Sequence, residues 1–459
     1  MNKSSISFYG GVGSVTGANF LFTTSSRKNI LVDCGLIQGD KVATEDNRRP
    51  WAYDVNSVNA LFVTHAHLDH VGRIPKLIKD GYKGPIYSTP QTKALAEIIL
   101  NDAVTILADE AKQNGTSPLF DVNDVGNSFL NWKTLNYHEI FNLDSSISVI
   151  LKDAGHILGS SMIEFSEKLG DGKLQKILFT GDLGNSPAPL LPDTEKIGDI
   201  DYVVMESVYG DRNHEGKEGR SNKFEKIVKE AIGRGGALVI PTFSVDRTQV
   251  LLYELNNLVE KNKIPDIPIF VDSPMATKAT AIYSENSHLF KESIRNQIKS
   301  GDDIFKFPRL KYTISATDSR EIKETNGPKI ILAGSGMSIG GRVISHERNY
   351  LSDPKSTILL VGYQTAGSLG RELAEGAKKV KIYRDTIKVK AKIETLYGYS
   401  AHRDSDHLLE FVTTANGLKK VFVVMGELKA SMYLAQKIND EIGVKAVVPQ
   451  INDVVELIW

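Results

Sequence analysis

Residues 64–70 read Thr-His-Ala-His-Leu-Asp-His and place three imidazoles and a carboxylate close together in the chain. The apolar run at 60–63 precedes them and predicts a buried strand that ends at this loop. Residues two apart on an extended segment point the same way, so His65 and His67 can bind one metal ion. Asp69 and His70 follow after the chain turns and can reach a second ion. Imidazole and carboxylate ligands without a thiolate suit zinc, and they also tolerate manganese or iron.

Four such side chains are too few to surround two ions, and the rest of the chain supplies more of the same types. Apolar, strand-like segments precede three further candidates, which are His156, Asp182 and His402. Asp182 is the natural residue to bridge the two ions. Asp33 ends another apolar run, where its carboxylate could accept the outer N–H of a histidine ligand and fix its tautomer. The sequence therefore predicts a two-metal centre supported by an aspartate.

These motifs resemble those of metallo-β-lactamase-fold hydrolases of the β-CASP nuclease branch. This branch includes the polyadenylation cleavage endonuclease and RNA-processing nucleases of bacteria and archaea. Asp33 matches the first family signature. The resemblance implies seven metal ligands, which are His65, His67, Asp69, His70, His156, Asp182 and His402.

The middle of the chain resembles the inserted β-CASP domain. Residues 205–210, with Glu206, are similar to the acidic signature that opens the insert, and later signatures match at 241–247, 272–276 and 334–342. Between 207 and 377 strand-like and helix-like segments alternate, which predicts a parallel sheet flanked by helices. We therefore expect an α/β fold, a metallo-β-lactamase αββα sandwich (1–206 and 378–459) with an inserted α/β β-CASP domain (207–377).

The resemblance implies a metal-dependent ribonuclease. His402 stands where DNA-repair members of the branch usually carry valine, which favours RNA as the substrate. A hydroxide bridging two zinc ions would attack phosphorus and leave a 5′-phosphate and a 3′-hydroxyl. The expected catalytic residues are Asp69, Asp182, Glu206 and His402. We expect an endonuclease acting on single-stranded RNA, with 5′-to-3′ exonuclease activity as a second possibility, in RNA processing or decay.

The chain departs from the family where the polyadenylation endonuclease has a histidine proposed as general acid, because residues 370–372 read Gly-Arg-Glu. Ionisable candidates for that role are Glu372, Glu206 and His346. Backbone N–H groups and arginines for binding phosphate are expected at Arg247, Ser335, Gly336, Met337, Arg342, Arg371, Ser400 and Ala401.

A net charge of −1 is unusual for an enzyme that binds nucleic acid. Between 371 and 403, however, nine basic residues face four acidic ones, a local surplus of five positive charges. The single cysteine, Cys34, excludes an internal disulfide and fits a reducing compartment. The sequence has neither a signal-peptide pattern at its start nor an apolar run long enough to span a membrane. We expect a cytoplasmic protein with no membrane partner, and the resemblance leaves a homodimer open.

Three other functions are compatible with parts of this pattern. A small-molecule hydrolase acting on a thioester or lactam would use the same ligands, but it would not need the long insert. A DNA nuclease of the same branch is disfavoured by His402. An inactive RNA-binding subunit of a processing complex would be expected to have lost ligands, and this chain keeps all seven candidates.

Overall fold

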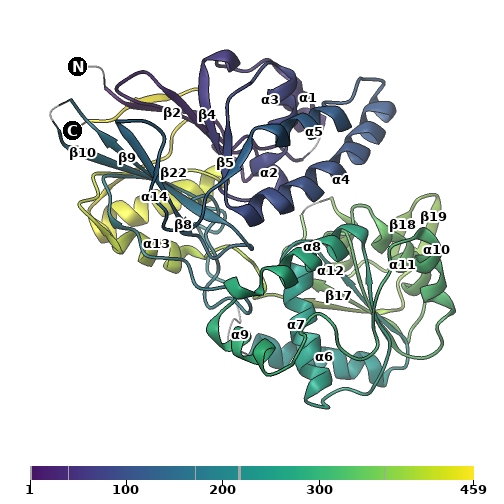
Figure 1. Cartoon of the computed structure of the whole chain (residues 1–459). Helices are drawn as coiled ribbons and strands as arrows, with labels where there is room; N and C mark the ends of the chain where they lie inside the picture. Colours follow the sequence, from purple (N-terminus) through teal and green to yellow (C-terminus); the bar gives the residue numbers. More distant parts are fainter. Residues whose placement is uncertain (1–2, 40, 171, 215–218, 366, 459) are drawn as a thin grey trace. The chain divides into compact units, whose positions relative to one another are not determined.

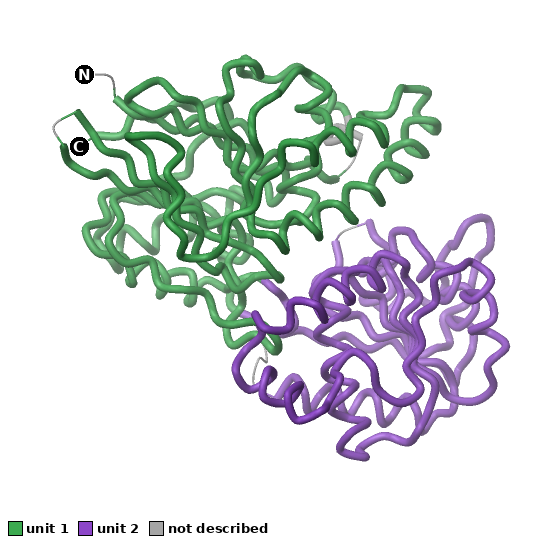
Figure 2. The backbone as a smooth tube through the Cα atoms, viewed as in Figure 1, with its two compact units in different colours: residues 1–213, 402–459 green, residues 214–401 purple. Residues whose placement is uncertain are grey.

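The structure, a computed structural model, describes residues 3–39, 41–170, 172–214, 219–365 and 367–458. The chain forms two compact units, which Figure 2 shows in different colours. Unit 1 comprises residues 1–213 and 402–459, and unit 2 comprises residues 214–401. Each unit is described by itself.

Unit 1 is built on two seven-stranded sheets. The first has the order β24-β1-β2-β3-β4-β5-β6, with strands Val454–Glu456, Ser5–Gly10, Asn19–Thr23, Asn29–Val32, Val58–Phe62, Ile86–Ser88 and Trp132–Thr134. The second has the order β23-β22-β12-β10-β9-β8-β7, with strands Lys445–Val447, Lys420–Val423, Tyr202–Met205, Leu174–Phe179, Ser161–Lys168, Ile147–Asp153 and Phe141–Asn142. A short parallel pair joins β11 (Gly198–Asp199) to β21 (Ala415–Asn416).

Alternating side chains on the second sheet divide between two hydrophobic cores. On β10, Ile177 and Phe179 enter the core shared with the first sheet, where Phe20 and Phe62 also lie. Leu178, between them, enters the outer core with residues of the two C-terminal helices. Successive residues of a strand point to opposite faces, so one apolar strand packs both layers.

Helices cover the outer face of each sheet (Figure 1). Against the second sheet lie α13 (Ser405–Thr413) and α14 (Leu428–Ile442). The helices between β3 and β6 are α1 (Lys41–Arg48), α2 (Leu68–Val71), α3 (Ile74–Lys79), α4 (Pro90–Asn114) and α5 (Val122–Leu130), with a 3-10 turn at Val55–Ser57. The predicted αββα sandwich is confirmed.

Unit 2 contains a six-stranded parallel sheet of order β15-β14-β16-β13-β17-β20. Its strands are Leu310–Tyr312, Ile269–Asp272, Lys329–Ala333, Ala237–Pro241, Thr357–Val361 and Lys392–Leu396. The helices are α6 (Arg220–Gly233), α7 (Arg247–Glu260), α8 (Pro274–Glu285), α9 (Glu292–Lys299), α10 (Ala316–Glu321), α11 (Arg342–Tyr350) and α12 (Leu369–Ala374), with 3-10 turns at Ser287–Leu289 and Ile322–Glu324. Strands β18 (Lys379–Ile382) and β19 (Asp385–Lys388) form a separate hairpin. The inserted α/β domain is confirmed.

The boundaries of unit 2 differ from those expected from the sequence. They fall at 213/214 and 401/402, where the sequence suggested 206/207 and 377/378. The second boundary is later because β20 pairs in parallel with β17 and so belongs to the sheet of unit 2. Asn213 Nδ2 donates to Asp406 Oδ2 at 2.6 Å, so the chain leaves unit 1 and returns to it at neighbouring points.

Apolar and basic residues alternate at 387–393, a pattern that predicts one strand, but the segment belongs to two strands. The first part lies in β19, which pairs with β18, and the last part in β20. Between them the N–H groups of Lys390 and Ala391 both donate to the carbonyl of Leu351, at 2.8 and 2.9 Å. These two bonds redirect the chain from the hairpin to the parallel sheet.

Candidate metal centre

The predicted ligands of unit 1 lie at the ends of strands from both sheets. His65 and His67 follow β4 of the first sheet, and Asp69 and His70 lie on the short helix α2 that comes next. Three more acidic or imidazole side chains follow strands β8, β10 and β12 of the second sheet, and these are His156, Asp182 and Glu206. His402 precedes α13. These side chains therefore come together at one end of the sandwich.

A first group of possible ligands consists of His65, His67, His156 and Asp182. His67 Nδ1 lies 3.1 Å from Nε2 of His65 and 3.2 Å from Nε2 of His156. Asp182 Oδ2 lies 3.4 Å from the His65 nitrogen and 3.6 Å from the His156 nitrogen. Ligands bonded at about 2.0–2.1 Å to a tetrahedral ion stand roughly 3.3 Å apart. The four side chains therefore have the spacing of a tetrahedral site.

A second group consists of Asp69, His70 and Asp182. His70 Nε2 lies 3.3 Å from Asp182 Oδ1 and 3.9 Å from Asp69 Oδ2. Both His70 Nε2 and Asp182 Oδ1 are buried and lack a hydrogen-bond partner among the described residues. Unsatisfied buried acceptors are costly, and a cation between them would satisfy both.

The third group consists of Asp182, Glu206 and His402. His402 Nδ1 lies 3.3 Å from Glu206 Oε1 and 3.8 Å from Asp182 Oδ2. Glu206 is buried and accepts the N–H of Leu183 at 2.6 Å, which fixes its carboxylate beside the histidine. Asp182 belongs to all three groups, as expected for a bridging ligand.

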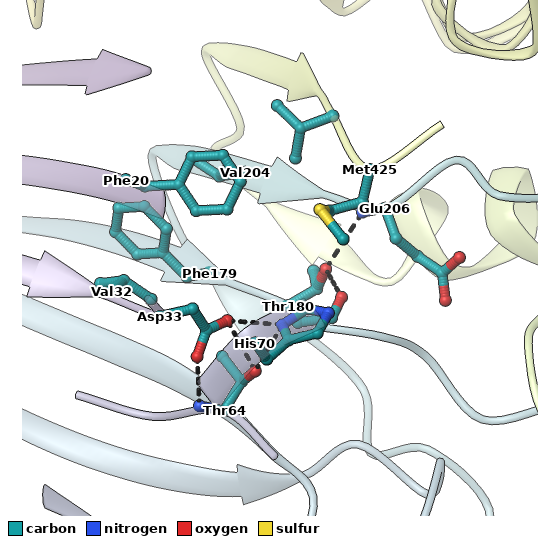
Figure 3. A pocket seen from close by; sticks show the side chains of 12 residues that line it. Phe20, Val32, Asp33, Thr64, His70, Phe179, Thr180, Val204, Glu206 and Met425 are labelled. Carbon is teal, nitrogen blue, oxygen red and sulfur yellow. Dashed lines mark hydrogen bonds and ion pairs between the residues drawn. The ribbon is translucent and has the colours of Figure 1, made fainter. Parts of the chain in front are cut away.

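Asp33 supports the centre from behind. Its Oδ2 accepts the Nδ1–H of His70 at 2.8 Å, and it is held in turn by the N–H and hydroxyl of Thr64, each at 2.8 Å (Figure 3). With Nδ1 donating to Asp33, Nε2 is the nitrogen of His70 that faces Asp182 and is available to a metal ion. Phe20 and Phe179 line the adjoining pocket, and apolar surroundings of this kind strengthen the hydrogen bond.

In the first ligand group, burial and neighbouring charges favour the protonation states that metals bind. Burial, together with nearby imidazoles, holds the pKa of His67 and of His156 well below the ordinary value, which keeps them neutral. Burial opposes the charge of Asp182, yet His70 and His65 hold its pKa well below the usual range. Neutral imidazole and ionised carboxylate are the ligand forms. The donor set therefore fits divalent cations such as zinc.

Arg403 fixes the segment that carries His402, and the sequence offered no signal for this role. Its Nε donates to the carbonyl of Gly184 at 3.0 Å and its guanidinium reaches Ser186 Oγ at 3.4 Å. The N–H of Arg403 donates to the carbonyl of Leu183 at 3.0 Å. Arg403 thereby ties the loop after Asp182 to the segment of His402. Thr64 was also missed as a supporting residue, although it stands next to His65 in the motif.

Three predicted residues of unit 2 make contacts inside that unit. Arg342 donates to Asp272 Oδ1, and His346 Nε2 donates to Asp272 Oδ2, both at 2.7 Å. These contacts hold the pKa of the Asp272 carboxyl well below its usual range despite burial. Arg247 is buried and donates to the carbonyl of Val361 at 3.0 Å. Structural roles account for all three side chains.

The remaining predicted residues of unit 2 lie on loops and on α12. Ser335, Gly336 and Met337 follow β16, while Ser400 and Ala401 directly precede His402 in the chain. Glu372 is exposed on α12, and Arg371 pairs with Glu375 at 2.6 Å on the same helix. Seven predicted ligands and Glu206 thus come together in unit 1, while the predicted phosphate-binding residues lie in unit 2.

Three protein families match the chain. Residues 23–182 match the metallo-beta-lactamase superfamily domain, residues 248–373 the Beta-Casp domain, and residues 386–449 the Zn-dependent metallo-hydrolase RNA specificity domain. No described helix is long and apolar enough to cross a membrane.

Similar proteins cover nearly the whole chain. Ribonuclease TTHA0252 of Thermus thermophilus is 35% identical over 91% of this chain and 92% of its own length. Transcription termination factor FttA of Methanosarcina mazei is 31% identical over 95% of this chain and 69% of its own. A crystal structure of a protein of unknown function from Enterococcus faecalis, 13% identical, shares the fold with a TM-score of 0.61 over 99% of this chain and 100% of that one. The chain belongs to the β-CASP ribonucleases of the metallo-β-lactamase superfamily.

Proposed function

We propose that the protein hydrolyses phosphodiester bonds of single-stranded RNA at a centre that holds two divalent metal ions. The observation that carries this proposal is the position of Asp182, whose two oxygens face two different sets of ligands. A carboxylate shared in this way is suited to hold two ions a few Å apart. When bound, such ions supply a hydroxide at neutral pH and stabilise the charge on the phosphate oxygens.

Each ion would have its own ligands. His65, His67 and His156 would hold the first, and Asp69, His70 and His402 would hold the second, with Asp182 shared. Three imidazoles at the first position favour zinc, and the larger share of oxygen ligands at the second also suits manganese. Two zinc ions per chain are therefore the proposed content, with manganese as the substitute.

Glu206 has a positioning role in this proposal. Its carboxylate accepts the N–H groups of Leu183 and Val208, at 2.6 and 3.3 Å, and faces His402. Anchored on two backbone donors, it can orient the imidazole without moving itself. Asp69 and Asp182 are the carboxylates placed to hold a nucleophilic oxygen and its proton.

Single-stranded RNA is the proposed substrate because of His402 and because of the relatives. A histidine at this position completes the second ligand set. The RNA specificity domain matches residues 386–449, which include His402, and one relative is named a ribonuclease. We propose internal cleavage as the main activity, with 5′-to-3′ trimming as a second one. The homodimer stays a prediction of the sequence.

The testing experiment uses RNA labelled at either end, purified protein of known metal content, the Asp182→Ala variant and a DNA of the same sequence. We expect RNA to be cut, DNA to be cut far more slowly, and the variant to be inactive. Equal cleavage of DNA would point to a DNA nuclease. Turnover of a chromogenic ester without RNA cleavage would point to a small-molecule hydrolase.

A further inference from the structure

Three aromatic side chains are exposed at the carboxyl end of the parallel sheet in unit 2. Phe243 follows β13, Tyr363 follows β17, and Tyr397 follows β20. The three strands are neighbours in the sheet. The exposed fractions of the three residues are 44%, 49% and 49%. Large aromatic side chains normally contribute to the core, so this row needs a reason to face solvent.

Hydrogen bonds and close packing hold the segments that carry these rings. The backbone carbonyl of Phe243 accepts the hydroxyl of Thr248 at 2.7 Å. A methyl group added to Gly336 would come within 2.9 Å of the Phe243 ring, so the ring lies against the glycine backbone. Gln364, next to Tyr363, donates to the carbonyl of Gly336 at 3.2 Å. The β16 loop, Phe243 and Tyr363 are therefore connected.

Further hydrogen bonds hold the segments that carry the two tyrosines. The N–H of Gly362 donates to the carbonyl of Leu396 at 3.0 Å, which ties the segments that carry Tyr363 and Tyr397. Beneath them, the buried Arg247 donates to the carbonyl of Val361. Arg371 lies on α12, which contacts β20, and its side chain is 40% exposed. The ion-pair partner of Arg371 is Glu375, the C-cap residue of α12, and the guanidinium stays at the surface.

We propose that Phe243, Tyr363 and Tyr397 form a platform on which unpaired bases of single-stranded RNA stack, with Arg371 beside the phosphates. This proposal rests on the RNA substrate proposed above and adds the surface that receives its bases. The three rings follow the ends of three neighbouring strands, and adjacent strands lie about 4.8 Å apart, so rings carried there offer positions for more than one base. Stacking on aromatic rings tolerates any base, and a guanidinium adds attraction for the backbone. Duplex bases are already stacked, so the platform selects single strands.

The test is the steady-state cleavage of labelled single-stranded RNA by the metal-loaded enzyme. Tyr363→Leu keeps an apolar side chain but removes the ring, and we expect KM to rise about five-fold or more with kcat nearly unchanged. Phe243→Leu should behave in the same way. Tyr363→Phe keeps the ring and should keep the KM. A matched control is Tyr433→Leu on α14, since Tyr433 is exposed to a similar degree, 52%, in unit 1.

A second measurement distinguishes binding of the RNA bases from binding of the RNA backbone. An abasic ribose-phosphate oligomer competes for the enzyme without offering bases, so its inhibition constant should be the same for wild type and Tyr363→Leu. An equal loss of affinity for the abasic oligomer would overturn the platform, as would an equal rise in KM in Tyr363→Phe.

Different results would overturn the platform and the proposed ribonuclease function. Unchanged KM in both leucine variants of an enzyme that cuts RNA would overturn the platform alone and assign the rings to a protein partner. A wild-type protein that holds two metals and leaves RNA intact would overturn the proposed function and the platform with it.

Discussion

Nδ1 of His70 donates a hydrogen bond to Oδ2 of Asp33 at 2.8 Å, and this contact fixes which nitrogen of the imidazole faces Asp182. The two residues are 37 positions apart in the chain. Asp33 has a φ of 58°, a conformation that asparagine tolerates better than most residues. Asp33→Asn is therefore a substitution that keeps the backbone and changes the acceptor.

We expect Asp33→Asn to weaken metal binding by about 10- to 100-fold, because outer partners of this kind orient and polarise the ligand. Competition with a chelator of known affinity measures the change. Asp440→Asn, on the exposed side of α14, is the matched control. Unaltered metal affinity in Asp33→Asn would remove Asp33 from the support of the centre.

Asp182→Ala should abolish RNA cleavage and reduce the bound metal, since its two oxygens face both ligand sets. Although burial opposes its charge, His70 and His65 hold the pKa of Asp182 well below its usual range, so we expect a modest fall in the melting temperature of metal-free protein at neutral pH. Elemental analysis and calorimetry give the two quantities. A large loss of stability in the metal-free variant would instead make Asp182 a structural residue.

His402→Ala should remove the second metal selectively and lower the content from two ions per chain to one. The reason is that His402 is absent from the first ligand group and is a proposed histidine ligand of the second ion, beside Asp182 and Glu206. His288→Ala, exposed in unit 2, controls for the loss of an imidazole. Two tightly bound metals in His402→Ala would contradict the assignment.

Arg403→Lys should weaken the second metal without removing a ligand. Arg403 uses separate nitrogens of its planar guanidinium for Gly184 and Ser186, and the single nitrogen of lysine does not reproduce that geometry, so the anchor between the loop of Asp182 and the segment of His402 is weakened. We expect roughly a 10-fold lower affinity at the second site, as for other supporting residues. Titration of metal-free protein resolves the two sites, and equal weakening of both would argue for a general loss of packing.

Glu347 in unit 2 should make stability depend on pH. Burial raises the pKa of this carboxyl from 4.5 to about 7, although Ser338 donates a hydrogen bond to it. Between these two pH values the folded state keeps a proton that the unfolded state has released. Stability should therefore fall as pH rises from about 4.5 to about 7, by roughly 3 kcal/mol for a difference of this size.

Glu347→Gln removes the titration, so the variant should gain stability relative to wild type as pH rises through this window. Urea unfolding at pH 5 and pH 8 measures the difference. If the two proteins lost stability in parallel, Glu347 would not be the group responsible.

The sequence predicts the long helices well and the short basic segment at 387–393 poorly. The sequence predicts helices at 247–260 and 428–442, and these are the observed bounds of α7 and α14. The segment from 387 to 393 alternates like one strand, but hydrogen bonds to Leu351 divide it between two sheets. Such bonds depend on a residue far away in the chain, and alternation alone does not reveal them.

The candidate metal centre was foreseen more fully than the residues around it. Histidine and aspartate at strand ends have few other uses in such a pattern, so their types and spacing already indicate the site. Arg342 and His346, in contrast, looked like free functional groups, yet both bind the buried Asp272. An ion pair of this kind is set by packing, and no local pattern distinguishes a paired arginine from one that awaits a phosphate.

The two crossings between the units lie next to each other in unit 1, where Asn213 and Asp406 are hydrogen-bonded. A short loop between them would close unit 1 without disturbing either sheet. Unit 2 therefore has the topology of a cassette, which one genetic event could introduce or exchange. Glu206 and His402 stand just outside its two ends. Any replacement cassette would be joined to the chain beside the metal centre, so cassette and centre are constrained to change together.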